Sequence, residues 1–476
     1  MQFITYLPVS KGRGEFIVDY QSVLILGLGK SGKEAAFLLK EKGAEVTVAE
    51  LEEKFSTLQK KKELERFGVR VIFGSHRGTL LKKKNLVILS PGVSNDLPIV
   101  KKARSLNIPV ISELDFASRF IPRKNLIAIT GTNGKTTTAF LTYKILKKSE
   151  LSVKLGGNIG IPLSRLARSS FSLNSSCRIV TEVSSFQLEM SPTFSPHIYC
   201  VLNISPDHLD RHSSFSEYRK IKAAPLFRMK KDDFAILNYD QYPVKSLGNV
   251  TQAKVIFFSQ RQKLNEGLFI DNNRIVANIG KTRVHIPLDN LQPHKFHNWE
   301  NVLCAVACAL IEKVTPELIR DSLLGYKPLP HRQQLIEEID GVKFIDDSKA
   351  TNRAAVENLV GSLTSPAVLI MGGKDKGDDF SSLKRYFPGK VKNLIVIGEA
   401  KNRIKRQLEG AVPIMESSSL KEAVRLAFSL SEKGGLVVLC PGCSSFDEFI
   451  SYRHRGRVFK KEVKKLKKEI EEKNSV

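Results

Sequence analysis

Short apolar runs alternate with amphipathic segments along most of the chain, as in α/β proteins. From Val23 the sequence reads as an apolar strand, a glycine turn, an amphipathic helix and a second apolar strand, which together make a βαβ unit. Further strands are predicted at residues 86–89 and 110–112, and Ile121-Pro122 marks the end of the pattern. We therefore expect a first, Rossmann-like domain over residues 1–122.

The alternation continues in residues 123–328. A strand at 126–130 enters a glycine-containing loop and then a helix that runs to Leu146, and later strands are predicted at 177–183 and 199–204. This order predicts a central domain of the P-loop ATPase type with a mostly parallel sheet.

A proline-rich segment, KPLPHR, precedes a third set of apolar runs. VKFIDDS, AVLIMGG, NLIVIG and GLVVLCPG read as buried strands with helices between them, so a second Rossmann-like domain is expected over residues 329–476. In its tail, Phe459, Val463, Leu466 and Ile470 recur at helical spacing and predict a surface helix with a lysine-rich outer face. The predicted fold class is thus α/β in three domains.

Composition narrows the choice of protein class. Among 476 residues, 42% are hydrophobic, yet no stretch is long and apolar enough to cross a bilayer, and the first residues do not resemble a secretion signal. The six cysteines lie mostly in apolar runs and predict buried, reduced thiols, with no redox role for the C-x-x-C of Cys440 and Cys443. We expect a cytoplasmic monomer without a membrane span.

The formal charge of +26 raises the question of an anionic partner. Much of the excess lies in short lysine runs, such as residues 60–62 and 82–84, which are typical of solvated faces. A basic surface also suits nucleotide substrates, so small molecules are expected as partners and nucleic acid is not.

The loop after the strand at 126–130 carries the clearest chemical signal. It reads Gly131-Thr132-Asn133-Gly134-Lys135-Thr136-Thr137, between an apolar strand and a helix, where backbone N–H groups and a helix N-terminus converge on an anion. Lys135 supplies a charge for the β- and γ-phosphates of ATP, and the Thr136 hydroxyl is placed to bind Mg²⁺. The first glycine lies three residues before Gly134 instead of the five of the common P-loop.

GTNGKTT resembles the loop of the Mur ligase and folylpolyglutamate synthetase superfamily. Further motifs follow in collinear order and resemble the Mur ligases that add D-glutamate: GGNIG, TEVSSFQLE, NISPDHLDRH, HNWEN, LPHR, DDSKATN, GGKDKG and CPGCSSFDEF. The resemblance spans nearly the whole chain. It implies an ATP-dependent ligase that forms an amide bond between UDP-N-acetylmuramoyl-L-alanine and D-glutamate through an acyl phosphate, in peptidoglycan precursor synthesis.

The resemblance also implies roles for individual residues. Two Mg²⁺ ions are expected at Thr136, Glu182, His208 and Lys222, with Lys222 carrying a carbamate that turns a cation into an anionic ligand. Lys135, His208 and Lys222 are the expected catalytic residues. Nucleotide contacts outside the loop are expected from Asn298, Asn301, Arg332 and Asp347. D-Glutamate is expected at Lys349, Thr351, Lys376, Ser445 and Phe446, in a third domain that closes on ATP.

The first domain carries Gly27-x-Gly29-x-x-Gly32 with Glu50 at the end of the second strand, which alone would suggest NAD. Mur ligases use the related domain to hold a uridine diphosphate. The resemblance therefore implies that the UDP substrate is bound by Gly29, Lys30, Ser31, Glu50, Ser90, Pro91, Gly92, Asn158 and His208.

Three alternatives remain open from the sequence. Another Mur ligase, adding L-alanine or a diamino acid, fits the same loop, although the L-alanine enzyme usually has histidine where this chain has Asn133. An NAD-linked oxidoreductase rests on GLGKSG alone, and a basic nucleic-acid-binding ATPase rests on charge and the phosphate loop. The last two leave the remaining motifs unexplained, and the base that deprotonates the incoming amine stays unassigned.

Overall fold

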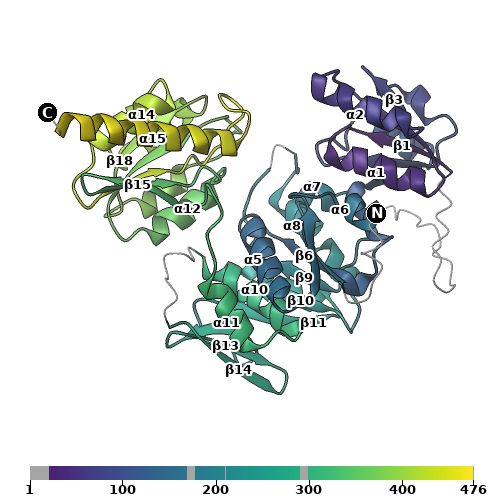
Figure 1. The fold of residues 1–476 in the computed structure, drawn as a ribbon, viewed down its shortest axis with the longest axis horizontal. Helices are drawn as coiled ribbons and strands as arrows, with labels where there is room; N and C mark the ends of the chain where they lie inside the picture. Colours follow the sequence, from purple (N-terminus) through teal and green to yellow (C-terminus); the bar gives the residue numbers. More distant parts are fainter. Residues whose placement is uncertain (1–20, 75, 169–176, 209–210, 290–297, 475–476) are drawn as a thin grey trace. The chain divides into compact units, whose positions relative to one another are not determined.

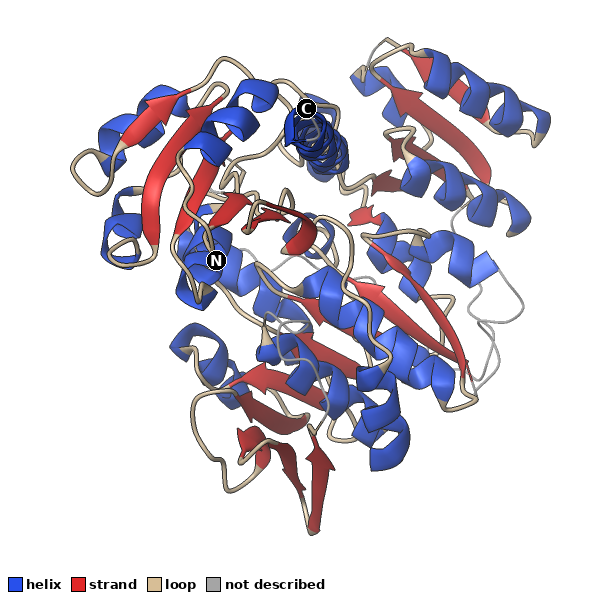
Figure 2. Ribbon diagram, turned by 60° about the vertical axis from the view of Figure 1, so that its left-hand side comes forward, coloured by secondary structure: helices blue, strands red, loops and turns tan. Residues whose placement is uncertain are grey.

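The computed structural model describes residues 21–74, 76–168, 177–208, 211–289 and 298–474 (Figure 1). The chain forms two compact units: the first holds residues up to 204, 216–288 and 300–322, and the second holds 205–215, 289–299 and 323 onward. The expectations for residues 1–20 and for His297 of the HNWEN motif lie outside the described residues. In Figure 2 the strands of each sheet are bordered by helices, as the alternating pattern predicts.

The first unit begins with a five-stranded parallel sheet of order β3-β2-β1-β4-β5. Its strands are β1 (Ser22–Leu26), β2 (Glu45–Glu50), β3 (Arg70–Phe73), β4 (Leu86–Leu89) and β5 (Val110–Ser112). Its helices are α1 (Lys30–Glu41), α2 (Phe55–Arg66), α3 (Pro98–Ser105) and α4 (Glu113–Ser118). β1 and β4 are buried along their whole length, which explains their unbroken apolar sequences.

The second sheet of the same unit has nine strands in the order β14-β13-β12-β11-β10-β9-β6-β8-β7. They are β6 (Leu126–Thr130), β7 (Ser152–Gly157), β8 (Cys177–Glu182), β9 (Ile198–Val201), β10 (Phe234–Asn238), β11 (Lys254–Ser259), β12 (Gly267–Asp271), β13 (Arg274–Ile279) and β14 (Thr282–Pro287). The strands are parallel from β7 to β12, and β12, β13 and β14 pair antiparallel. The antiparallel end was not foreseen in the sequence.

Seven helices accompany this sheet. They are α5 (Lys135–Lys148), α6 (Leu163–Arg168), α7 (Ser185–Leu188), α8 (Phe215–Ala223), α9 (Tyr242–Lys245), α10 (Trp299–Ile311) and α11 (Pro316–Leu324). β9 is shorter than the predicted 199–204, because the chain leaves the sheet so that the Asn203 carbonyl can accept a hydrogen bond from Thr132 N at 2.9 Å. This departure brings the segment after β9 to the loop after β6.

The second unit holds a six-stranded sheet of order β15-β16-β20-β17-β18-β19. Its strands are β15 (Gln334–Ile339), β16 (Val342–Asp346), β17 (Ala367–Gly372), β18 (Val391–Ile397), β19 (Ile414–Glu416) and β20 (Leu436–Leu439). All neighbours are parallel except β15 and β16. The four predicted strands of this region are confirmed as β16, β17, β18 and β20.

Helices cover both faces of this sheet. They are α12 (Arg353–Ser362), α13 (Lys401–Leu408), α14 (Leu420–Ser429) and α15 (Tyr452–Asn474). One core packs α12 and α13 against the sheet, and a separate core packs α14 and α15 against it. The predicted tail helix is confirmed, because Phe459, Val463 and Leu466 of α15 are buried in the second of these cores. Across the described residues, no helix combines the length and apolar character needed to cross a bilayer.

Candidate active site

The phosphate loop connects the C-terminal end of β6 to the first residue of α5. Gly134 has φ +83°, a left-handed conformation, and a Cβ there would lie 2.2 Å from Asn301 Oδ1, so a larger residue is excluded. Lys135 Nζ donates to the carbonyls of Gly131 and Thr132 at 2.8 Å each, so the loop curls around the ammonium. The loop thereby presents a cation and a helix N-terminus together, which suits a phosphate.

Two asparagines hold the loop and the start of α5 in place, one just after β9 and one on α10. Asn133 N donates to Asn203 Oδ1 at 2.8 Å, and Thr138 Oγ1 of α5 donates to Asn301 Oδ1 at 3.1 Å. Asn301, predicted as a nucleotide contact, packs its amide against the phosphate loop. Asn203 lies in a quoted motif but was not singled out.

A carboxylate and a hydroxyl meet at the start of α5. Thr136 Oγ1 donates to Glu182 Oε2 at 2.7 Å, and Asn158 Nδ2 donates to Glu182 Oε1 at 3.0 Å. Glu182 is buried at the end of β8. Since β8 pairs with β6 in parallel, their C-terminal ends share one edge, and two hard oxygen ligands of the kind that Mg²⁺ prefers lie next to the phosphate loop. Asn158, which was predicted to contact the UDP substrate, thus donates a hydrogen bond to this carboxylate.

Lys222 of α8 also contacts the phosphate loop. Its side chain is buried, and Nζ donates to the Gly131 carbonyl at 3.1 Å and to Thr130 Oγ1 at 3.3 Å. The ammonium lies 4.7 Å from the centre of the Tyr218 ring. Lys222 and Lys135 thus bind the same carbonyl oxygen, which brings two cationic groups close together.

A cleft of about 490 Å³ opens at the C-terminal edge of the first sheet. It is lined by all the first-domain residues predicted for the UDP substrate, namely Gly29, Lys30, Ser31, Glu50, Ser90, Pro91 and Gly92. Glu50 Oε2 accepts from Leu28 N at 2.7 Å, so the carboxylate fixes the glycine turn. A Cβ on Gly32 would lie 2.0 Å from the Gly27 carbonyl oxygen, which explains the third glycine of the fingerprint.

Two residues of this region were not predicted. His76 lines the cleft, and Lys60 Nζ donates to the Leu28 carbonyl at 2.9 Å. Burial lowers the pKa of Lys60, with a further contribution from the charge of Lys33. Both residues lie outside the quoted motifs, so no sequence pattern marked them as residues of this site.

The residues predicted for D-glutamate follow neighbouring parallel strands of the second unit. Lys349 and Thr351 follow β16, Lys376 follows β17, and Ser445 and Phe446 follow β20. Because β16, β20 and β17 are adjacent, these loops meet at one edge of the sheet. Lys376 Nζ donates to the Thr351 carbonyl at 3.4 Å, which connects two of the loops.

Arg455 of α15 hydrogen-bonds to the loops after β16 and β20, although it lies outside every motif quoted from the sequence. Its guanidinium is fully buried and donates to the carbonyls of Ser348 and Cys443 at 3.0 Å and of Ser444 at 3.2 Å. Burial lowers its pKa to about 10. Its helical position gave no signal, because all three bonded carbonyls lie outside the helix and the Ser348 carbonyl is 107 residues away.

The remaining predicted residues also belong to the second unit. They are Asn298, which precedes α10, together with His208, Arg332 and Asp347. Asp207, next to His208, accepts a hydrogen bond from Asn352 Nδ2 at 2.9 Å. The structure therefore groups Lys135, Thr136, Glu182 and Lys222 closely in one unit and places His208 in the other.

Asp347 has an unusual environment for a carboxyl group. Burial raises its pKa to about 7, against the opposing charge of Arg332. A raised folded-state pKa means that the group stabilises the fold fully below its unfolded pKa, and that this contribution is lost as the pH rises from about 4 through 7. The carboxylate is therefore a source of instability at alkaline pH.

We expect Asp347→Asn to raise the melting temperature at pH 8, because it removes the free-energy cost of a buried carboxylate. Each kcal/mol removed should raise the melting temperature by on the order of 2–4 °C. The gain should vanish near pH 4, where the wild-type carboxyl is protonated. Thermal unfolding at both pH values measures this difference. Asp340→Asn, in an exposed turn of the same unit, is the matched control and should leave the melting temperature unchanged at either pH. An equal gain at both pH values would contradict the assignment.

Three family models match in order: a Mur ligase MurD-like N-terminal domain over residues 21–112, a Mur ligase middle domain over 129–309, and a Mur ligase glutamate ligase domain over 331–443. The second and third models begin at β6 and just before β15.

Similar curated relatives extend over nearly the whole chain. Proteins named UDP-N-acetylmuramoylalanine--D-glutamate ligase are 38% identical over 443 residues in Acidobacterium capsulatum and 37% identical over 458 residues in Thermoanaerobacter pseudethanolicus. The first alignment covers 92% of this chain and 95% of the relative, and the second covers 94% and 99%.

Solved structures share the fold at low sequence identity. A pseudomurein peptide ligase type C from Methanothermus fervidus matches with a TM-score of 0.57 and 19% identity, and a UDP-N-acetylmuramate-alanine ligase from Thermotoga maritima with 0.55 and 17%. Each alignment covers 94% of this chain and 100% of the other. These matches confirm the predicted three-domain α/β fold class.

Proposed function

The chain belongs to the Mur ligase family, and from this premise we propose that it joins D-glutamate to UDP-N-acetylmuramoyl-L-alanine by an ATP-dependent amide bond in peptidoglycan precursor synthesis. The proposal rests on the phosphate loop, which has Lys135 at its centre and the Thr136–Glu182 pair beside it. This arrangement can hold a triphosphate and its metal. We place the reaction in the cytoplasm, where ATP is available.

The proposed reaction has two steps. The alanyl carboxylate attacks the γ-phosphorus of ATP and gives an acyl phosphate with ADP as the leaving group, and the amine of D-glutamate then displaces phosphate from the acyl carbon. Lys135 and the amides at the start of α5 stabilise charge on the transferring phosphoryl group. Bound Mg²⁺ would neutralise phosphate charge, with Thr136 and Glu182 as its oxygen ligands.

Substrate binding is divided between the remaining groups. We propose that the cleft of the first sheet binds the uridine diphosphate, whose pyrophosphate suits the glycine turn and the N-terminus of α1. The cations Lys349 and Lys376 are proposed to bind the carboxylates of D-glutamate, on loops that the hydrogen bond from Lys376 Nζ to the Thr351 carbonyl connects. His208 is proposed as the ligand of a second Mg²⁺ ion.

Phosphate release from ATP tests the function directly. The purified chain is incubated with UDP-N-acetylmuramoyl-L-alanine and, separately, D-glutamate, L-glutamate, L-alanine or L-lysine. We expect turnover with D-glutamate only, together with formation of the dipeptide product. Preferred turnover with L-alanine or L-lysine would assign the chain to another Mur ligase activity.

We propose further that Lys222 carries a carbamate in the active protein. As an ammonium, Lys222 shares the Gly131 carbonyl with Lys135, and two like charges at this distance repel each other in a buried site. Addition of CO₂ to Nζ removes this repulsion and creates an anionic oxygen ligand for a metal.

Depletion of CO₂ is therefore expected to lower turnover several-fold, and added bicarbonate should restore it. The measurement compares initial rates in degassed buffer with and without bicarbonate at constant pH. Lys220→Ala, on the same helix, is the control variant and should keep the bicarbonate response. A rate independent of bicarbonate, with no added CO₂ mass on Lys222, would rule out the modification.

A further inference from the structure

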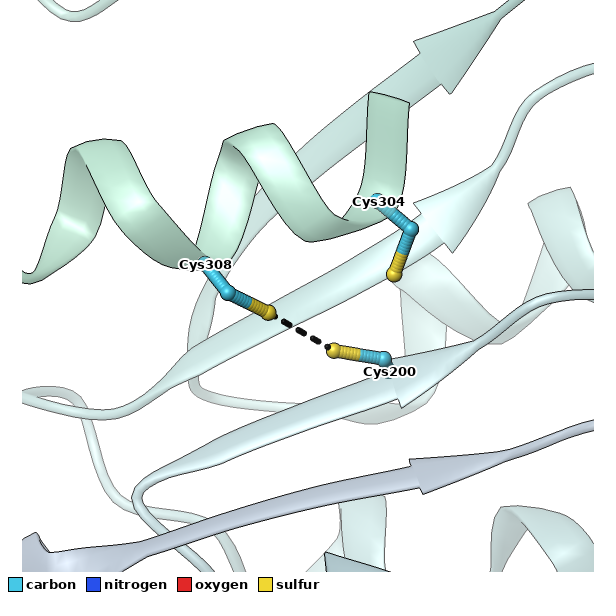
Figure 3. Close-up of side chains that lie close together, drawn as sticks. All are labelled: Cys200, Cys304 and Cys308. Atoms are coloured by element: carbon cyan, nitrogen blue, oxygen red, sulfur yellow. Dashed lines mark hydrogen bonds between the residues drawn. The ribbon is translucent and has the colours of Figure 1, made fainter. Parts of the chain in front are cut away.

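Three cysteine thiols meet in the core of the first unit, in a place that the proposed reaction does not use (Figure 3). Cys200 lies on β9, and Cys304 and Cys308 lie one turn apart on α10, facing it. The sulfur atoms of Cys200 and Cys308 are 3.4 Å apart, and all three lie within 4.8 Å of one another. Three thiols at this separation can bind one common ion.

The cluster is closed to solvent, because all three side chains have no exposed surface. Hydrogen bonds from Cys200 and Cys304 lower the pKa of Cys308, while burial raises the pKa values of the other two thiols. Beside Cys308, the buried Thr142 hydroxyl also contributes to lowering the pKa of that thiol. A polar side chain of α5 thus lies against the thiols.

The net charge of the three thiolates together with their bound ion indicates which ion the site can hold. Zn²⁺ in structural sites takes four ligands, and with three thiolates it would leave a net negative charge. Cu⁺ with three thiolates would leave a larger one. Burying an uncompensated charge in an apolar core is costly, whereas a trivalent ion with three thiolates is neutral and needs no fourth ligand. A thiophilic trivalent metalloid fits both the number of sulfurs and the burial.

We propose that Cys200, Cys304 and Cys308 form a three-thiolate binding site for a trivalent metalloid, for which arsenite is the probe. In the binding step, three As–O bonds of As(OH)₃ break and three As–S bonds form. The three thiol protons leave with the three hydroxides as water, and no atom changes oxidation state. The reactant is small and uncharged, so local opening of the core admits it.

The site is connected to the phosphate loop through two asparagines. Cys200 precedes Asn203 by three residues, and Asn203 accepts a hydrogen bond from Asn133 N of the loop. Cys304 follows Asn301 by one helical turn, and Asn301 contacts Thr138 of α5. Joining β9 to α10 through arsenic therefore shifts both supports of the loop. The expected loss of ATP turnover rests on the proposed function, whereas the binding itself does not.

Intact-protein mass spectrometry after incubation with sodium arsenite tests the binding. The reduced full-length chain should gain the mass of one arsenic atom less three hydrogens. Cys304→Ala and Cys200→Ala should each weaken binding by more than about 100-fold, because loss of a ligand exceeds the effect of losing an outer-shell partner. Cys177→Ala removes a buried cysteine outside the cluster and should bind as the wild type does.

Other results would overturn the proposal. They are no adduct on the wild type, an adduct that keeps its affinity in both cluster variants, or tighter binding of Zn²⁺ than of arsenite in a competition. Circular dichroism of each variant shows that it is folded before binding is compared. If the adduct forms but ATP turnover is absent even without arsenite, the site stands and the proposed function fails.

Discussion

Replacement of Lys135 by alanine is expected to lower kcat/KM for ATP-dependent ligation by about 10³-fold, because loss of one preorganised charge-stabilising donor costs about 10²–10³-fold. The ammonium is the only part of the loop that brings a full positive charge to the phosphates, and the carbonyls of Gly131 and Thr132 hold it in place. Phosphate release with all three substrates present measures the effect.

A matched variant separates this effect from damage to the helix. Lys144→Ala lies on the exposed face of α5 and should retain wild-type turnover. Melting temperatures of both variants show whether each is folded before the rates are compared. Turnover close to wild type in the Lys135 variant would remove the basis of the proposed function.

Glu182→Gln is expected to weaken the apparent affinity for Mg²⁺, with turnover at fixed Mg²⁺ reduced by about 10²-fold. The substitution keeps the size of the side chain and one oxygen for Thr136, but it removes the charge that a divalent cation needs. A series of initial rates against Mg²⁺ concentration measures the shift in apparent affinity.

Excess Mg²⁺ should restore part of the lost rate, which a misfolded variant would not show. Glu266→Gln, an exposed residue in the same unit, should leave the Mg²⁺ dependence unchanged. If the Glu182 variant loses turnover without any change in the Mg²⁺ concentration at half-maximal rate, then Glu182 does not bind the metal.

The strands with the strongest apolar runs were located closely from the sequence. Residues 86–89, 110–112 and 126–130 were predicted and correspond to β4, β5 and β6. These strands are buried on both faces, so their sequences carry a continuous signal. β14 was missed, because its mostly exposed, mixed sequence resembles a loop until it pairs with β13.

The local parts of the candidate site were also readable. The phosphate loop and the glycine turn before α1 are short segments whose backbone geometry depends on glycines at fixed spacing, so the pattern alone indicated an anion site at each. The family resemblance then supplied the candidates that bind the metal and the substrates.

The sequence by itself therefore determined the alternation of strands and helices, the phosphate loop and the family. Only the tertiary structure decided that Asn158 holds Glu182, that Arg455 bonds to the loops after β16 and β20, and that Cys200 meets α10. The physical reason is that periodicity and turn chemistry act between near neighbours in the chain. Contacts across tens or hundreds of residues depend instead on how the strands order in each sheet and on which helix packs over them.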